Sequence, residues 1–167
     1  MAEPGVRIDH PNRRKAASKL TRAIVVLLLL VSAALVAIVT VGGWDALQGA
    51  NALQVAYIVV YVLLAFFVLR WSRGVLPLAA ALAIVLLIFA AVSAPAWFDR
   101  DNPGFAEPAL DKGVLGLVTA LIVPVQLLLI AFGMSGFRQA WNVEVEGPID
   151  ESPPQRPDRG GPAPAAA

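Results

Sequence analysis

Four long segments of the chain contain no charged residue. They are Ala23 to Trp44, Ala46 to Leu69, Gly74 to Phe98 and Gly113 to Phe137, with lengths of 22, 24, 25 and 25 residues. A helix of about 20 apolar residues crosses the hydrocarbon core of a bilayer, which is about 30 Å thick. The remaining loops and tails are too short to bury a core of their own. The sequence therefore predicts an all-α integral membrane protein with four transmembrane helices.

The expected architecture is an antiparallel four-helix bundle with disordered tails. We expect a basic N-terminal tail over 1–20, a transmembrane domain over 21–141 and a proline-rich tail over 142–167. The predicted spans are 21–41, 52–69, 75–92 and 113–134, with a long loop over 93–112 that includes Pro95. Trp141 is expected to continue the last helix into the interface. Six prolines between Gly147 and Ala167 forbid regular structure there.

Basic residues gather on one predicted side of the membrane. They precede the first span, lie between the second and third spans, and follow the fourth span. The positive-inside rule places this side, and with it both termini, in the cytoplasm. Next to the bilayer, these residues are expected to fix the topology and to contact anionic lipid headgroups. The expected anchors are Arg13, Arg14, Lys15, Lys19, Arg22, Arg70, Arg73 and Arg138. The basic N-terminal stretch is short and has no interleaved aromatic residues, so nucleic-acid binding is not expected.

The sequence offers few groups for chemistry. It contains no cysteine, which excludes disulfides and thiolate metal sites. The four apolar segments hold no acidic, basic or histidine side chain, and such side chains mark proton relays and ion paths inside membranes. The single histidine, His10, lies in the N-terminal tail, away from any haem site in the bundle. We therefore expect no cofactor, no metal and no enzyme activity.

Gln126 is the most informative polar residue within a span. It follows Pro124, which lacks the N–H that would bind the carbonyl of Ala120, near the middle of the fourth span. In a structural interpretation the Gln126 amide satisfies that carbonyl or binds a neighbouring helix. In a functional interpretation the Pro124 kink opens a small cavity with Gln126 as its polar wall. The candidate partners across the bundle are Ser32, Thr40, Tyr57 and Tyr61.

Small residues suggest where helices approach closely. Gly113, Gly116 and Ala120 predict a packing face on the fourth span, because small side chains let helix backbones come near one another. Gly133 and Gly136 are expected to loosen the end of that helix instead of forming an interface.

Three classes of function follow from this pattern. The first is an accessory or interaction subunit of a membrane complex, with a membrane-protein partner or a second copy of the chain. The second is a passive channel or transporter for a neutral or lipidic solute that uses the Pro124 and Gln126 region. The third is a membrane enzyme acting at the loop over 93–112. Ten arginines against three lysines favour a GC-rich bacterium, and therefore a bacterial plasma membrane.

Overall fold

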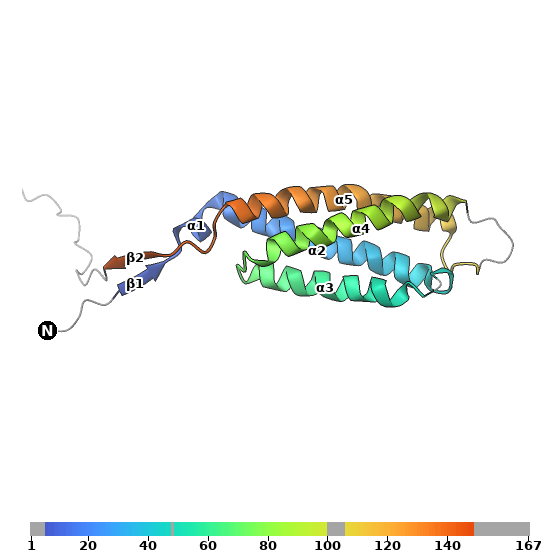
Figure 1. Ribbon diagram of the computed structural model, residues 1–167, viewed down its shortest axis with the longest axis horizontal. Coiled ribbons are helices and arrows are strands. Elements are labelled where there is room, and N and C mark those ends of the chain that lie inside the picture. Colours follow the sequence, from blue (N-terminus) through green and yellow to red (C-terminus); the bar gives the residue numbers. More distant parts are fainter. Residues whose placement is uncertain (1–5, 48, 100–105, 149–167) are drawn as a thin grey trace, which may run out of the picture.

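The computed structural model describes residues 6–47, 49–99 and 106–148. Four long helices lie alongside one another in an elongated bundle (Figure 1). All four are long and apolar enough to cross a membrane, which confirms the prediction of four such helices. The elements in chain order are β1 (Val6–Asp9), α1 (Pro11–Arg14), α2 (Ala16–Gly42), the short 3₁₀ helix η1 (Trp44–Ala46), α3 (Asn51–Leu69), α4 (Val75–Phe98), α5 (Lys112–Arg138) and β2 (Val145–Pro148).

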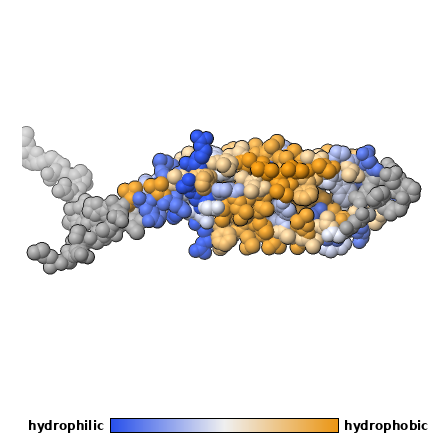
Figure 2. Space-filling view, in the orientation of Figure 1, coloured by the Kyte–Doolittle hydropathy of each residue, from blue (hydrophilic) through white to orange (hydrophobic). Residues whose placement is uncertain are grey.

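The two ends of the bundle differ in what they carry. The turn between α3 and α4 lies at the same end as α1 and both strands, which we call the terminal end (Figure 1). The opposite end, which we call the loop end, carries η1 and the start of α5. On the face in Figure 2, apolar residues cover the middle of the bundle and hydrophilic residues gather toward its ends. Many large apolar side chains remain exposed, for example Val92 and Leu117 at 72% and 67%. Such a belt suits contact with hydrocarbon.

Two of the helices extend well beyond the predicted spans. α2 begins at Ala16 instead of residue 21, and α4 continues through Pro95 to Phe98 instead of ending at residue 92. Pro95 lies in the last turn of α4, where its missing N–H removes a single backbone bond. Trp97, the penultimate residue of α4, is buried under η1, and this packing favours the helical continuation. Reading Pro95 as a loop residue was therefore wrong.

Parts of both tails are ordered, which corrects the expectation of disorder for these segments. β1 pairs with β2 in an antiparallel ribbon outside the bundle, with Val6 opposite Pro148 and Asp9 opposite Val145. Between the ribbon and the bundle the two tails are also in contact. There the Asn12 amide donates to the carbonyl of Ala140 at 3.0 Å. Residues 1–5 and 149–167, including most of the predicted proline-rich tail, lie outside the described residues.

α2 is the central helix of the bundle. It packs against both α3 and α5, whereas α4 packs mainly along α5. In the most apolar 18-residue stretch of α2, 50% of the residues are buried. The share in the corresponding stretch of α3 is 28%. Although α3 and α4 follow one another in the chain, they make only sparse contact. The bundle therefore has one loosely packed seam, between α3 and α4.

Candidate functional site

The buried centre of the bundle contains a hydrogen-bonded network around Gln126. Its side chain is fully buried, and its Oε1 accepts a hydrogen bond of 3.0 Å from the hydroxyl of Tyr61. Its Nε2 donates to Oγ of Ser32 at 2.9 Å, and the Ser32 hydroxyl donates to the carbonyl of Leu28 at 2.7 Å. Gln126 thus joins α5 to both α2 and α3. This arrangement is what the structural interpretation of Gln126 expects.

Pro124 and Gln126 lie on different sides of α5. Pro124 is exposed, whereas Gln126 is buried, and the helix continues through both from Lys112 to Arg138. The amide of Gln126 is directed across the bundle instead of back to the carbonyl of Ala120. The idea that this amide replaces the bond lost at Pro124 was therefore wrong.

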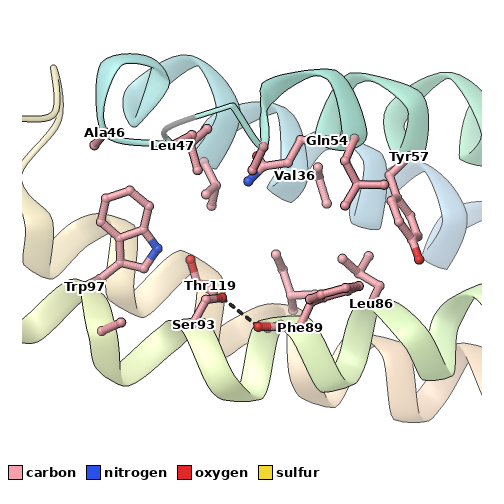
Figure 3. A pocket seen from close by; sticks show the side chains of 16 residues that line it. Val36, Ala46, Leu47, Gln54, Tyr57, Leu86, Phe89, Ser93, Trp97 and Thr119 are labelled. Carbon is pink, nitrogen blue, oxygen red and sulfur yellow. Dashed lines mark hydrogen bonds between the residues drawn. The ribbon is translucent and has the colours of Figure 1, made fainter.

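A cavity of about 300 Å³ lies in the α3–α4 seam, toward the loop end of the bundle (Figure 3). Neither Gln126 nor Pro124 lines it, whereas Tyr57 does. Tyr57 and Tyr61 pack edge to face at 5.7 Å between ring centroids, so the two predicted tyrosines divide between the cavity and the buried network. The lining residues include Val36 and Val39 from α2, Gln54 from α3, Leu86, Phe89 and Ser93 from α4, and Thr119 from α5.

The lining of the cavity is apolar and uncharged, with a few polar groups. The Thr40 hydroxyl lies 2.6 Å from Oε1 of Gln54 and 2.7 Å from the carbonyl of Val36, and these two acceptors share its single hydrogen. The Gln54 amide nitrogen lies on the cavity side of α3 (Figure 3). The Tyr57 hydroxyl points from α3 toward α4. These two groups are hydrogen-bond donors directed into the seam. The hydroxyls of Ser93 and Thr119 donate to carbonyls of their own helices, at 2.7 Å each.

The cavity is accessible from the side of the bundle. Leu53 on α3 and Phe89 on α4 both line it, and their side chains are 50% and 54% exposed. They lie on opposite sides of the seam, so the cavity opens between the two helices where lipid would surround a membrane-spanning bundle. Pockets for small ligands typically start near this volume and are likewise mostly apolar with a few placed polar groups. We call this cavity and its opening the α3–α4 groove.

A cluster of aromatic and basic side chains closes the terminal end. Trp141 is fully buried and packs edge to face against Trp71, with ring centroids 5.5 Å apart. The expectation that Trp141 continues α5 was wrong. The helix ends at Arg138, and Ala140 takes a positive φ of 49° that turns the chain back toward the bundle.

The predicted basic anchors all lie at this terminal end, but they differ in setting. Arg14, Lys15, Lys19, Arg70 and Arg138 are exposed, whereas Arg13, Arg22 and Arg73 are partly buried. The last three fold onto aromatic rings. The guanidinium carbon of Arg22 lies 4.1 Å from the ring centroid of Trp71, and that of Arg73 lies 4.3 Å from the ring centroid of Phe137.

The predicted small-residue face does not form one buried surface within the chain. Gly116 is buried against the ring of Phe98, whereas Ala120 is exposed. The N–H of Gly113 donates to Oδ1 of Asp111, which caps the helix, at 2.8 Å. Gly136, in contrast, is a close-packing position, so the expectation that it only loosens the end of the helix was wrong. A Cβ there would lie 3.1 Å from the Trp141 ring and 3.2 Å from Leu76. The three-residue spacing of Gly133 and Gly136 was the signal for this interface.

Among the described residues, no three His, Cys, Asp or Glu side chains come together to hold a metal ion. Residues 100–105 of the predicted loop lie outside the described residues. Comparisons with protein families, with curated proteins and with solved structures found no match.

Proposed function

We propose that the chain is an integral protein of a bacterial plasma membrane, with four antiparallel passes and both termini in the cytoplasm. Four apolar helices of spanning length support the passes. The orientation is supported by the basic residues, because the anchors from three separate parts of the sequence all meet at the terminal end (Figure 1). Anionic lipids of the cytoplasmic leaflet would surround that end.

We propose that the protein acts by binding inside the membrane, as an accessory or interaction subunit of a membrane complex. The observation that carries this proposal is the α3–α4 groove. Packed protein interiors leave few voids larger than a water molecule, yet the groove leaves about 300 Å³ between two consecutive helices. A side chain from a transmembrane helix of a partner, seated between Leu53 and Phe89, would fill this space and gain the dispersion contacts that the groove lacks.

A second candidate function is a passive channel or transporter for a neutral or lipidic solute. The donors of Gln54 and Tyr57 favour it, since they would bind a carbonyl or ester oxygen of an otherwise apolar molecule. The location within the bundle differs from the sequence-based hypothesis, because the groove replaces the Pro124 and Gln126 region as the candidate pocket. A membrane enzyme acting at the loop over 93–112 remains a third hypothesis with no further support.

Filling the groove tests the proposal. In Ser93→Phe a new ring occupies the groove, and the lost hydroxyl binds only the carbonyl of Phe89 in its own helix. Ala91→Phe is the matched control, because Ala91 is an exposed position on α4 that does not line the groove. Each tagged variant is expressed at native level and purified in mild detergent, and protein and lipid that co-purify in fixed ratio are measured by mass spectrometry.

The accessory function predicts that Ser93→Phe loses a stoichiometric protein partner that Ala91→Phe retains. Loss of a small molecule or lipid instead would favour the second candidate. Equal co-purification with both variants would contradict a role for the groove in either function.

A further inference from the structure

We propose that the arginines at the terminal end form a binding site for the phosphate of an anionic lipid. The site consists of Arg13, Arg22 and Arg73 around the rings of Trp71 and Phe137, and we call it the arginine cluster. It lies at the opposite end of the bundle from the α3–α4 groove and does not depend on binding there, but it rests on the proposed insertion of the bundle in a membrane.

The positive charges of the cluster are held in place by uncharged partners. Arg22 donates from Nη1 to the carbonyl of Leu69 at 3.2 Å, and Arg73 donates from Nε to the carbonyl of Phe137 at 2.7 Å. Arg13 donates from Nε to the carbonyl of Trp141 and from Nη2 to the amide oxygen of Asn142, both at 3.2 Å. None of these acceptors carries a charge. A phosphate would therefore add an anionic partner to these bonds.

Each guanidinium keeps donors for such an anion. A guanidinium has five N–H donors in a planar fork, and the bonds above use one each from Arg22 and Arg73. The remaining N–H donors match the spacing of phosphate oxygens. Arginine binds these oxygens with paired, charge-assisted hydrogen bonds.

The aromatic residues fix these side chains before any ligand binds. Both Arg13 and Arg22 pack on the ring of Trp71. The guanidinium carbon of Arg22 lies 4.1 Å from the ring centroid, and that of Arg13 lies 5.9 Å from it. Buried Trp141 packs against Trp71 from the side and restricts the position of the indole. Arginines held in this way lose less side-chain entropy when they bind a ligand.

The backbone at Trp71 is strained in a way that favours a role for its side chain. Its φ is 63°, in the left-handed region that usually holds glycine. The N–H of Ser72 donates to the carbonyl of Phe67, and the N–H of Trp71 donates to that of Val68, each at 3.0 Å. This pair of bonds is the Schellman motif, in which glycine is the usual residue at the position of Trp71. A tryptophan there costs backbone energy but supplies the ring that supports two arginines.

The depth of the arginine cluster favours a lipid phosphate over a free anion. Arg22 directly precedes the charge-free segment of α2, and Leu69 and Phe137 mark the corresponding ends of α3 and α5. The cluster therefore lies where the hydrocarbon-spanning part of three helices ends. Lipid phosphates occupy this level of a bilayer, and tryptophan and arginine are favoured there.

Lipid selectivity of the purified full chain tests the proposal. Arg22→Gln removes one charge of the cluster. Arg138→Gln is the matched control, because Arg138 is an exposed anchor at the same end but outside the cluster, so it reports the general attraction of anionic lipid. Thermal unfolding in neutral detergent is followed during titration with phosphatidylglycerol, phosphatidylcholine or inorganic phosphate. Native mass spectrometry counts the bound lipids. Arg73→Gln serves as a second cluster variant if Arg22→Gln does not yield folded protein.

We expect phosphatidylglycerol to raise the melting temperature of the parent chain more than phosphatidylcholine does. The concentration needed for half of this effect should rise roughly tenfold in Arg22→Gln, as expected for one lost charge-assisted bond, and less than twofold in Arg138→Gln. Equal shifts in the two variants, or equal effects of the two lipids, would overturn the site. Equal protection by inorganic phosphate would overturn the lipid as its ligand.

Discussion

The Tyr61 hydroxyl on α3 donates a hydrogen bond of 3.0 Å to the amide oxygen of Gln126 on α5, in the fully buried centre of the bundle. The same amide reaches Ser32 on α2 at 2.9 Å, so one side chain joins three helices. Fully satisfied polar networks specify how helices pack, because an unpaired polar group in an apolar interior is costly. These contacts favour a structural role for Gln126, and the candidate site lies elsewhere.

Gln126→Leu should lower the free energy of unfolding by roughly 1 to 3 kcal/mol, because it leaves the buried Tyr61 hydroxyl without an acceptor. Unfolding by SDS, titrated into mild detergent and followed by circular dichroism, measures this change. Ser93→Phe in the groove should bring a much smaller change. A Gln126→Leu variant that unfolds at a higher SDS fraction than the parent would contradict the structural role.

Replacing both Tyr61 and Gln126 should lower the free energy of unfolding by less than the sum of the two single substitutions. Tyr61→Phe leaves the Gln126 oxygen unpaired, whereas the double variant with Gln126→Leu leaves neither group unsatisfied. A double-mutant cycle on the same SDS titration should give a coupling free energy of about 0.6 to 1.7 kcal/mol. Strict additivity would mean that the bond contributes nothing to stability.

Alanine usually gives a more stable protein than glycine at a helical position, but at Trp71 we expect the opposite order. Both Trp71→Ala and Trp71→Gly lose the indole and its packing on Trp141, so the difference between them reports the backbone alone. Because φ is 63°, we expect the glycine variant to be more stable by roughly 1 kcal/mol. Thermal unfolding of the two variants side by side provides the measurement. If the alanine variant were the more stable, Trp71 would not occupy the left-handed region.

The two glycines near the end of α5 should respond differently to alanine. A Cβ at Gly136 would lie within 3.3 Å of the Trp141 ring, Leu76 and Thr21, whereas one at Gly133 would meet its nearest atom at 3.7 Å. Gly133→Ala should gain up to about 1 kcal/mol from helix propensity. Gly136→Ala should lose roughly 1 to 3 kcal/mol from overpacking against the buried Trp141. Melting temperatures in one detergent compare the pair, and equal shifts would contradict this packing.

The orientation of the chain has its own test. A reporter that is active only in the cytoplasm should be active when fused after Ala167 and silent when inserted at Asn102. This expectation rests on the basic residues at the terminal end. The reverse pattern of activity would place both termini outside the cytoplasm.

The helices could be predicted because their signal is local. An uncharged segment long enough to span a bilayer identifies a helix without knowledge of its neighbours, and Gln126 could be recognised because few polar residues interrupt these segments. The partners that it binds, Tyr61 and Ser32, were among the candidates, but only packing could select them.

Features that depend on distant contacts could not be predicted. The pairing of β1 with β2 joins segments from the two tails, and the return of Trp141 toward Trp71 depends on the left-handed turn at Ala140. The groove arises because α3 and α4 each pack better on another helix than on one another. No local pattern in the sequence indicates which helices will pack closely on one another.

Photo-crosslinking in native membranes tests the proposed role of the groove most directly. Phe89 and Ile88 are neighbours on α4 with nearly equal exposure, 54% and 56%, but only Phe89 lines the groove. Each is replaced in turn by p-benzoylphenylalanine in the otherwise unchanged chain. The account predicts that irradiation at position 89 yields one discrete adduct with a second protein, while position 88 yields only lipid adducts. The same lipid adducts at both positions, with no discrete protein adduct at position 89, would contradict it.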